Sequence, residues 1–519
     1  MNEPWNYPNG SLPIQKPRDQ AQDPKYETFD SRSIRKDESL STEILVIGSG
    51  AGGAVVAAQL AGQGHEVLIL EQGGRFTRET FHESPLSAYL KMYENGGLTA
   101  TIGQPSIALP YGRAIGGTTI MNSGTCLRVP PWVLARWAEL GLDDLTMESL
   151  APHYEAVEKR LNIQPVEADI AGDNCHIVRR GAEKLGLSGG YLPRNARGCV
   201  GSGRCVFGCP SGAKQSMERS YLPDALAHGA KLYAHARCER ILFEDRRAVG
   251  VQARTSDGQI FHVRCKHLVL SAGAIGSPLI LEKNGLGGKA LGRHLHIHPA
   301  GKVIAQMDQA VNGQGVPQSY FVDDLHEDGI MLEGAYVPPE FSSIAMPHFG
   351  AQHAALMNES SHLATFGIMV TDTGSGRVCA GLNGRARIYY SLSQTDAERF
   401  KRGIILCAKI FFAAGAQKLF FGLPGLETLD KESDISKLEA YDISPGDLEL
   451  AAFHPMGTCR IGNDPSQSVV DQNMFLHRYE CISVADASVI PSSIGVNPQL
   501  TIMALARRAA DHIAHTIRK

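Results

Sequence analysis

The sequence has no excess of either charge and no long apolar run that stands on its own. Its 50 Lys and Arg residues nearly balance its 54 Asp and Glu residues, so the formal net charge is −4. A protein that binds nucleic acid or another polyanion usually carries a clear positive surplus, so no such partner is expected. A membrane-spanning helix needs about 18 or more consecutive apolar residues, and we expect none here.

The N-terminal 40 residues lack the apolar core of a secretion signal. The first apolar stretch begins only after Glu43, which is too far from the N-terminus for that purpose. Residues 1–40 are instead rich in proline and mixed charge, and we interpret them as an N-terminal arm on the surface. A bacterial-type cytoplasm is the expected compartment, and export by another route stays open.

The eleven cysteines are odd in number and unevenly spread. This pattern argues against a disulfide framework, because such frameworks belong mainly to small secreted chains with paired cysteines. Most of these cysteines are expected to be small buried residues, and one group of three is the exception. With 519 residues, the chain can bury a large core, and two domains are predicted.

A strand, a glycine turn, a helix, a second strand and an acid follow one another in the stretch 44–71. Gly48 permits a tight turn, and Gly50 lets the backbone approach a pyrophosphate. Gly53 lets the helix pack closely on the strand, and the helix N-terminus faces the negative charge. Glu71 can accept hydrogen bonds from a ribose hydroxyl. The stretch predicts a dinucleotide site but does not distinguish NAD from FAD.

A second glycine-rich loop covers residues 112–124. Gly116 and Gly117 allow close backbone approach, while Thr118 and Asn122 offer hydrogen bonds. This combination suits a flat, polar heterocycle held against the main chain. Taken alone, the loop could also be a glycine turn between two elements.

Two residues near the C-terminus have side chains suited to catalysis. His454 is followed by proline and a glycine turn, and a neutral imidazole is a suitable base near physiological pH. Asn497 can donate a hydrogen bond to a substrate oxygen or accept one from its hydroxyl. A single histidine more often has a structural role. The catalytic interpretation of this pair therefore depends on the other motifs in the sequence.

These signals together resemble the glucose-methanol-choline (GMC) oxidoreductase family, from about Glu43 to the C-terminus. Both stretches that are diagnostic of the family are present, at 112–122 and 273–287. The second departs slightly, because Asn284 stands where the family usually has serine. The most specific match is the C-terminal HPMGTCR together with GVNP.

By this resemblance the cofactor is FAD. Its ADP half would be held by Gly48, Gly50, Gly53 and Glu71, and Cys238 falls where the family usually has a valine whose backbone meets the adenine. The isoalloxazine would lie near Gly117, Thr118 and Asn122. The ribityl-pyrophosphate segment would meet Asp486 and Ala487. The segment 116–124 has no histidine, the residue through which some members attach FAD covalently, so non-covalent binding is expected.

The resemblance implies oxidation of an alcohol to a carbonyl. His454 would accept the hydroxyl proton while a hydride passes to flavin N5, and Asn497 would position the oxygen. Three other functions remain open: an NAD-dependent dehydrogenase, an electron-transfer module that reacts only through a partner, and a flavoprotein with non-oxidative chemistry. The electron acceptor could be dioxygen, a quinone or a redox protein.

Cys199, Cys205 and Cys209 lie on a glycine-rich loop and could bind a metal or an iron–sulfur cluster. Their spacing resembles the tri-cysteine motif of bacterial FAD-dependent sugar dehydrogenases, which pass electrons through a [3Fe-4S] cluster to a partner. A similar loop occurs in sterol- and fatty-alcohol-oxidase-like relatives. The alternatives without a cluster are a loop near the flavin that is stabilised by cysteines, or one disulfide with a free thiol.

Three histidines, His294, His296 and His298, alternate along the sequence. On a strand they would face one side and could bind zinc or copper. The family has a similar stretch without a metal, and alternation alone is only strand periodicity.

The predicted fold is α/β, with a discontinuous Rossmann-like FAD-binding domain and an inserted α+β substrate-binding domain on an antiparallel sheet. We assign residues 41–125, 222–298 and 451–519 to the first domain, and 126–221 and 299–450 to the second. Within them a strand is expected at 386–392 and helices at 396–414 and 505–517.

Residues 331–341 and 348–357 are expected to line the substrate pocket. Five apolar or aromatic residues in or beside them favour an aromatic, sterol-like or aliphatic alcohol over a free sugar: Tyr336, Phe341, Met346, His348 and Met357.

Overall fold

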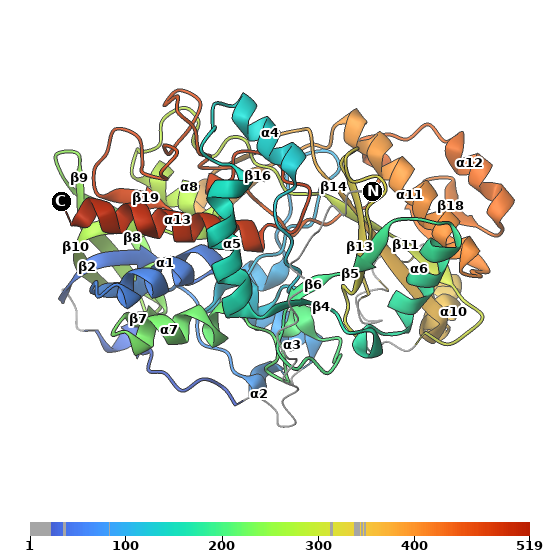
Figure 1. Ribbon diagram of the computed structural model, residues 1–519, viewed down its shortest axis with the longest axis horizontal. Helices are drawn as coiled ribbons and strands as arrows, with labels where there is room; N and C mark the ends of the chain where they lie inside the picture. The colour runs from blue at the N-terminus through green and yellow to red at the C-terminus, as the bar shows by residue number, and fades with distance from the viewer. Residues whose placement is uncertain are drawn as a thin grey trace.

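The computed structural model describes residues 22–34, 38–81, 84–311, 315–336, 343, 346 and 349–518. Two sheets, each covered by its own helices, lie at opposite ends of the longest axis (Figure 1). The predicted α/β class with one Rossmann-like and one antiparallel part is confirmed. No helix among these residues is long and apolar enough to cross a membrane.

The first sheet has eight strands in the order β1-β7-β3-β2-β10-β9-β8, with β19 also paired to β10. The strands β1, β7, β3, β2 and β10 pair in parallel in that order, and β19 is parallel to β10. The pairs β10–β9 and β9–β8 are antiparallel. The strands are β1 Phe29–Asp30, β2 Ser39–Ile47, β3 Val67–Leu70, β7 Lys231–Ala234, β8 Ala236–Glu244, β9 Arg247–Thr255, β10 Ile260–Leu270 and β19 Ile482–Val484.

Helix α1 (Ala51–Gly62) follows β2 and is buried along most of its length. It packs between α7 (Tyr221–Ala227) and the last helix, α13 (Gln499–Ile517), which α5 (Met147–Leu161) also contacts. In Figure 1 the red α13 lies beside the blue α1, so the two ends of the chain form one layer on this sheet. The predicted strands and helix of the stretch 44–71 are confirmed.

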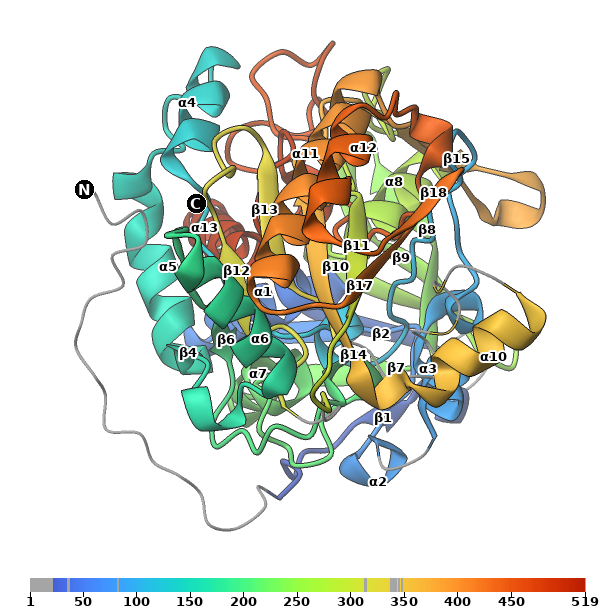
Figure 2. The same ribbon diagram turned by 90° about the vertical axis from the view of Figure 1, so that its right-hand side faces the viewer.

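The second sheet is antiparallel and has the order β18-β17-β11-β14-β13-β12-β5. Helix α11 (Gln394–Ala413) packs against β11, β13 and β14, and α6 (Asp173–Lys184) packs against α11. Figure 2 shows this sheet from its own end of the molecule. The strands are β5 Gly189–Tyr191, β11 Ala300–Gln306, β12 Tyr320–Val322, β13 Ile330–Gly334, β14 Leu363–Val370, β17 Lys418–Leu423 and β18 Leu426–Leu429.

The remaining elements connect or flank the two sheets. The helices are α2 Arg78–Phe81, α3 Pro85–Met92, α4 Pro131–Glu139, α8 Gly273–Lys283, α10 Gly350–Asn358 and α12 Ile435–Glu439. The strand pairs are β4 Ile163–Pro165 with β6 Pro193–Asn195, and β15 Arg377–Ala380 with β16 Ala386–Tyr389. Two of the three local predictions in the later part of the chain, the strand near 386–392 and the helix near 396–414, are therefore confirmed.

The third, the final helix, begins at Gln499, six residues before the predicted start at 505. Its first turns are buried almost all round, with Leu500, Thr501 and Met503 fully covered. A helical segment that is buried on every side does not alternate between an apolar and a polar face. The search for an amphipathic pattern therefore missed the first turns of this helix.

Candidate active site

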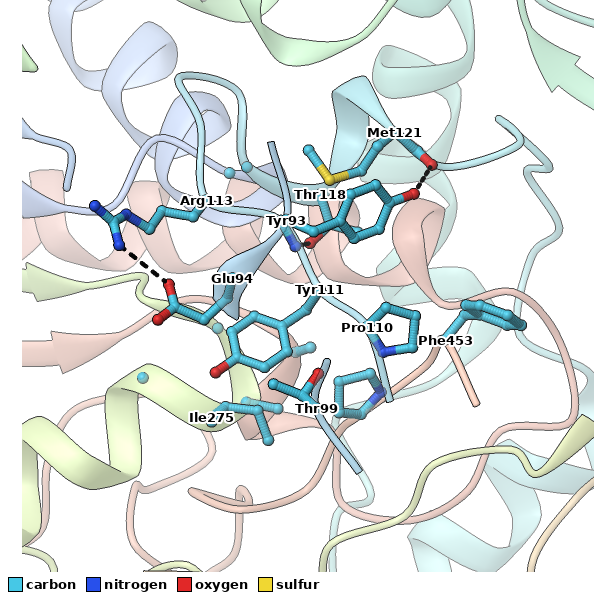
Figure 3. A pocket seen from close by; sticks show the side chains of 18 of the residues that line it. Tyr93, Glu94, Thr99, Pro110, Tyr111, Arg113, Thr118, Met121, Ile275 and Phe453 are labelled. Carbon is cyan, nitrogen blue, oxygen red and sulfur yellow. Dashed lines mark hydrogen bonds and ion pairs between the residues drawn. The ribbon is translucent and has the colours of Figure 1, made fainter. Parts of the chain in front are cut away.

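One large cavity, about 1730 Å³ in volume, lies between the two sheets and is lined by residues of both. Its wall includes Gly48 and Gly50 from the glycine turn after β2, and Glu333 and Gly367 from the second sheet. Figure 3 shows part of this wall, where Tyr93, Tyr111 and Phe453 gather. Pockets for one small ligand usually measure about 300–1,000 Å³, so this cavity has room for a dinucleotide and a substrate together.

Two of the three glycines in the turn after β2, Gly48 and Gly53, have no space for a side chain. A Cβ on Gly48 would lie 2.3 Å from the Ser271 carbonyl oxygen, and the φ of Gly48 is +102°. A Cβ on Gly53 would lie 2.0 Å from the Gly48 carbonyl oxygen. Gly53 therefore lets α1 pack closely on the turn, and the exposed backbone of the turn faces the cavity.

Glu71 ends β3 and is buried against the same turn. One carboxylate oxygen accepts from the backbone N–H and hydroxyl of Ser49, at 3.0 and 2.7 Å, and the other from the Gly73 N–H at 2.7 Å. Burial raises the pKa of Glu71, and these three bonds oppose that rise. Glu71 thus shapes the loop itself, and its contact with a ribose stays a prediction.

The second glycine loop touches the first. A Cβ on Gly117 would lie 2.8 Å from Gly50 Cα, and the Ser49 hydroxyl accepts from the Gly116 N–H at 3.0 Å. The Thr118 hydroxyl accepts from a backbone N–H of its own loop. Asn122 donates to the Gln499 side chain at 2.9 Å, and its Oδ1 is buried without a partner. The structure brings together the two loops that the sequence singled out separately.

Cys238, Asp486 and Ala487 also line the cavity. Cys238 lies on β8 and is buried. Asp486 accepts from the Gly273 N–H at 2.9 Å and from the Ser277 hydroxyl at 2.5 Å, both in the first turns of α8. Burial raises the pKa of Asp486.

His454 and Asn497 meet in the cavity. Asn497 Nδ2 lies 3.4 Å from His454 Nε2, although 43 residues separate them in the sequence. Burial, and after it the neighbouring His298, keeps the pKa of His454 well below the usual value, so the ring is neutral at physiological pH. The structure therefore presents an uncharged imidazole and an amide to whatever enters the cavity.

His298 contacts the ring nitrogen of His454 that faces away from Asn497, a role that the sequence did not indicate. Its Nδ1 lies 3.3 Å from His454 Nδ1, and its Nε2 accepts from the N–H groups of Ile494 and Gly495 at 3.1 Å each. Asp372 accepts from the His298 N–H and fixes this backbone. The expected strand of alternating histidines is wrong, since His298 has a φ of +47° and no strand forms here.

Glu333 is a second residue that the sequence did not single out. It lies on β13, is 4% exposed, and accepts from Asn497 Nδ2 at 3.4 Å and Gln318 Nε2 at 3.2 Å. Burial raises the pKa of Glu333 to about 7. The only signal for it is an acid at the fourth position of the otherwise apolar strand sequence IMLEG.

The three loop cysteines surround two buried cations at the edge of a small second cavity. Arg194 donates to Cys205 Sγ at 3.1 Å, and the backbone N–H of Lys214 donates to Cys209 Sγ at 3.4 Å. None of the eleven cysteines forms a disulfide. Over the described ranges, no three His, Cys, Asp or Glu side chains are placed to hold a single metal ion, and an iron–sulfur cluster on Cys199, Cys205 and Cys209 stays a prediction.

Arg194 and Lys214 also connect the cysteine loop, residues 199–209, to the second glycine loop. Lys214 Nζ donates to the carbonyl oxygens of Ile120, Asn122 and Cys205, at 2.9, 2.7 and 2.8 Å. Arg194 Nε donates to the Ser123 carbonyl oxygen at 2.8 Å. The segment 120–123 is therefore held in place from outside the cavity.

The predicted lining of the substrate pocket is met in part. Tyr336 lines the cavity. Met346 is buried in a small apolar cluster around Ile304, against which Met357 packs, rather than in the cavity wall. Phe341 and His348 lie outside the described residues.

One cavity is surrounded by a Rossmann-type glycine turn, a second glycine loop and a neutral His/Asn pair. This combination defines a dinucleotide-dependent oxidoreductase. The chain belongs to the GMC oxidoreductase family, whose two models match residues 89–300 and 382–506. A model described as an NAD(P)-binding Rossmann-like domain matches residues 46–88. The protein is accordingly an FAD-dependent oxidoreductase that acts on CH–OH donors.

Relatives support this assignment. The chain is 38% identical over 490 residues to an uncharacterized GMC-type oxidoreductase of Mycobacterium tuberculosis, covering 93% of this chain and 76% of that one. It is 28% identical over 522 residues to long-chain-alcohol oxidase FAO3 of Arabidopsis thaliana, covering 92% and 68%. Pyridoxine 4-oxidase from Mesorbium loti has the same fold, with a TM-score of 0.71 at 19% identity, covering 91% and 99%.

Proposed function

We propose that the protein oxidises an alcohol to the carbonyl compound, with His454 as the base and Asn497 positioning the reacting oxygen. The observation that carries this proposal is the 3.4 Å approach of Asn497 Nδ2 to His454 Nε2 in the wall of the large cavity. A neutral imidazole can take the hydroxyl proton, and an amide N–H can stabilise the negative charge that develops on oxygen. FAD, when bound, supplies the hydride acceptor.

The cavity wall supports non-covalent binding of FAD by the following residues. The ADP half would be held by Gly48, Gly50, Glu71 and Cys238 in the wall, with Gly53 packed behind them. The middle would meet Asp486 and Ala487, and the ring would lie near Gly117, Thr118 and Asn122. The unpartnered Asn122 Oδ1 is a buried acceptor that a ring N–H would satisfy. The segment 116–124 has no histidine for a covalent link.

The substrate proposed is a partly apolar alcohol, of the aliphatic, aromatic or sterol-like kind. Phe453 is 54% exposed and lines the cavity, as do Tyr336 and Met369. The relative that is named a long-chain-alcohol oxidase supports the same class. The electron acceptor proposed is dioxygen or a quinone, with a redox protein as the alternative.

The domain division proposed is a discontinuous FAD-binding domain, 41–125, 222–298 and 451–519, with 126–221 and 299–450 as the substrate-binding domain. The strands of each sheet support it, apart from the two-residue β1 and the first two residues of β2, which precede residue 41. Within 126–221, α5 packs in the first core and α6 in the second, so this segment joins both.

An anaerobic screen of alcohol classes tests the proposed function. The purified, FAD-loaded protein is mixed with aliphatic, aromatic and sterol alcohols and with a free sugar, and bleaching of the flavin absorbance is followed. An apolar alcohol should bleach the flavin, and air or a quinone should restore it. Bleaching by the sugar alone would contradict the substrate class, and no bleaching by any alcohol would contradict the function.

A further inference from the structure

Glu333 is a buried acid beside the proposed catalytic pair to which the proposed mechanism gives no task. It pairs with Gly367 across β13 and β14, and Lys302 of β11 pairs with the other side of the same glycine. This row of residues lines the cavity, while α11 packs against these three strands. Burying a carboxyl group is unfavourable, so its presence here needs a specific reason.

Glu333 is the meeting point of two hydrogen-bonded side chains. Its Oε2 accepts from both Asn497 Nδ2, at 3.4 Å, and Gln318 Nε2, at 3.2 Å. Gln318 in turn accepts from the hydroxyls of Thr125, at 2.9 Å, and Ser123. A continuous chain therefore runs from the end of the second glycine loop, through Glu333, to Asn497.

The two ends of an Asn amide have the same shape but opposite hydrogen-bonding character. An acceptor beside Asn497 selects the orientation in which the NH₂ group faces it. The second hydrogen of that NH₂ group is then free to point towards His454 Nε2, where the reacting oxygen would sit. The opposite orientation would place Asn497 Oδ1 against Glu333 Oε2 and would turn a lone pair towards an oxygen that gains negative charge.

We propose that Glu333 is a positioning residue, which keeps the NH₂ group of Asn497 directed at the reacting oxygen. The inference rests on the proposed function, because it concerns the residue that holds that oxygen. The unpartnered Oε1 of Glu333 is consistent with this role, since only Oε2 is engaged. A proton on Oε1 leaves Oε2 able to accept, so the neutral acid orients Asn497 and the carboxylate does so more strongly.

The ionisation of Glu333 gives this role a signature in pH. Burial raises the pKa of Glu333 to about 7, and the bond from Asn497 opposes that rise. The titratable side chains that line this part of the cavity include Lys302, Glu449, Tyr336, His298 and His454. Burial lowers the pKa of both histidines well out of this range. Burial lowers the pKa of Lys302 to about 8, so its charge changes at higher pH.

Since charge-assisted hydrogen bonds are about twice as strong as neutral ones, the rate of flavin reduction should rise about fivefold as pH rises through 7. The step should have a midpoint near the pKa of Glu333, below that of Lys302. A Lys302→Met variant should retain it.

The test compares wild type, Glu333→Gln and Glu333→Leu as FAD-loaded proteins in anaerobic stopped-flow reduction from pH 5.5 to 9. Glu333→Gln keeps an acceptor oxygen but cannot ionise, so it should stay within about tenfold of wild type and lose the step near pH 7. Glu333→Leu removes the acceptor and should reduce the flavin about a hundredfold more slowly at every pH, with substrate affinity changed little. Asp328→Asn is the control, because Asp328 precedes β13 and its partner is the exposed Arg402.

Wild-type reduction rates in Glu333→Leu, or the same step near pH 7 in Glu333→Gln, would overturn the inference. If Glu333→Leu fails to fold, the pH profile of Glu333→Gln decides alone. Failure of the proposed function is distinguishable, because wild type itself would then not be reduced by any alcohol.

Discussion

At the residue scale, the structure explains why particular side chains, or their absence, are required. Gly53 is the clearest case, because a methyl group there would overlap the Gly48 carbonyl oxygen. Gly62, at the far end of the same helix, has nothing within 4 Å of a Cβ. The two glycines are therefore a matched pair for substitution.

Gly53→Ala should abolish FAD retention and lower the melting temperature, because α1 must move away from the turn. Gly62→Ala should keep FAD and be neutral or more stable by up to about 1 kcal/mol, since alanine is the better helix former. FAD absorbance after gel filtration and thermal unfolding measure both effects. Equal FAD loading of the two variants would contradict the close packing at Gly53.

Asn497 is expected to contribute to the rate more than to binding. Asn497→Ala removes the N–H that faces the reacting oxygen and should slow anaerobic flavin reduction about a hundredfold, the usual loss for one such donor. Substrate affinity, obtained from the concentration dependence of the reduction rate, should change little. A variant with a normal limiting rate and weakened affinity would show that Asn497 only binds substrate.

Glu333 should make stability depend on pH. Folding raises the pKa of Glu333 from 4.5 to about 7, so between these values the folded state keeps a proton that the unfolded state releases. The free energy of unfolding therefore falls as pH rises through this window, by up to about 3 kcal/mol.

Glu333→Gln cannot ionise and should escape this loss. Its melting temperature relative to wild type should rise between pH 5 and pH 8, whereas that of Asp328→Asn should not. A constant difference across this range would mean that Glu333 is not buried as an acid.

At the element scale, hydrogen bonds from Lys214, just after the cysteine loop, fix the backbone of the second glycine loop. The carbonyl oxygens of Ile120, Asn122 and Cys205 all accept from the single ammonium group of Lys214, which is 2% exposed. Burial lowers the pKa of Lys214 to about 8. Loss of this group leaves three carbonyls to find other partners inside the protein.

Lys214→Met should therefore weaken FAD binding about tenfold, because an unsatisfied buried group costs about 1–3 kcal/mol. Lys184→Met is a matched control, since Lys184 also donates to a carbonyl oxygen, that of Ala413, but at an exposed position on α6. FAD dissociation constants from fluorescence titration of the apoprotein give the comparison. Identical dissociation constants for both variants and wild type would show that Lys214 does not fix the second glycine loop for FAD binding.

At the scale of the whole molecule, the sequence predicted the site residues that belong to a local motif. It missed those whose place in the site depends on strand pairing. The glycine turn, the second glycine loop and the His/Asn pair each have a local signature, and the first two meet where their neighbouring strands and helices bring them together. Glu333 and His298 have only weak ones, an acid in an apolar strand and a place in a run of alternating histidines. Their importance comes from the register of β13 against β14 and from a loop with positive φ angles. The cysteine spacing predicts an iron–sulfur cluster, which stays a prediction, and it could not reveal that Arg194 and Lys214 lie beside the thiols.

The two sheets place the proposed catalytic residues between elements far apart in the chain. His454 follows the second sheet and Asn497 precedes α13, so their approach depends on both cores being formed. This explains why the nucleotide fingerprint at the N-terminus and the proposed chemistry at the C-terminus lie on one cavity.

The most direct test of the central claim is anaerobic reduction of the flavin in His454→Ala by the alcohol that best reduces wild type. His515→Ala, at an exposed position near the end of α13, is the control. We expect yellow, FAD-loaded His454→Ala whose flavin is reduced by substrate several orders of magnitude more slowly, with a normal rate in the control. Bleaching of His454→Ala at the wild-type rate would contradict the assignment of His454 as the base.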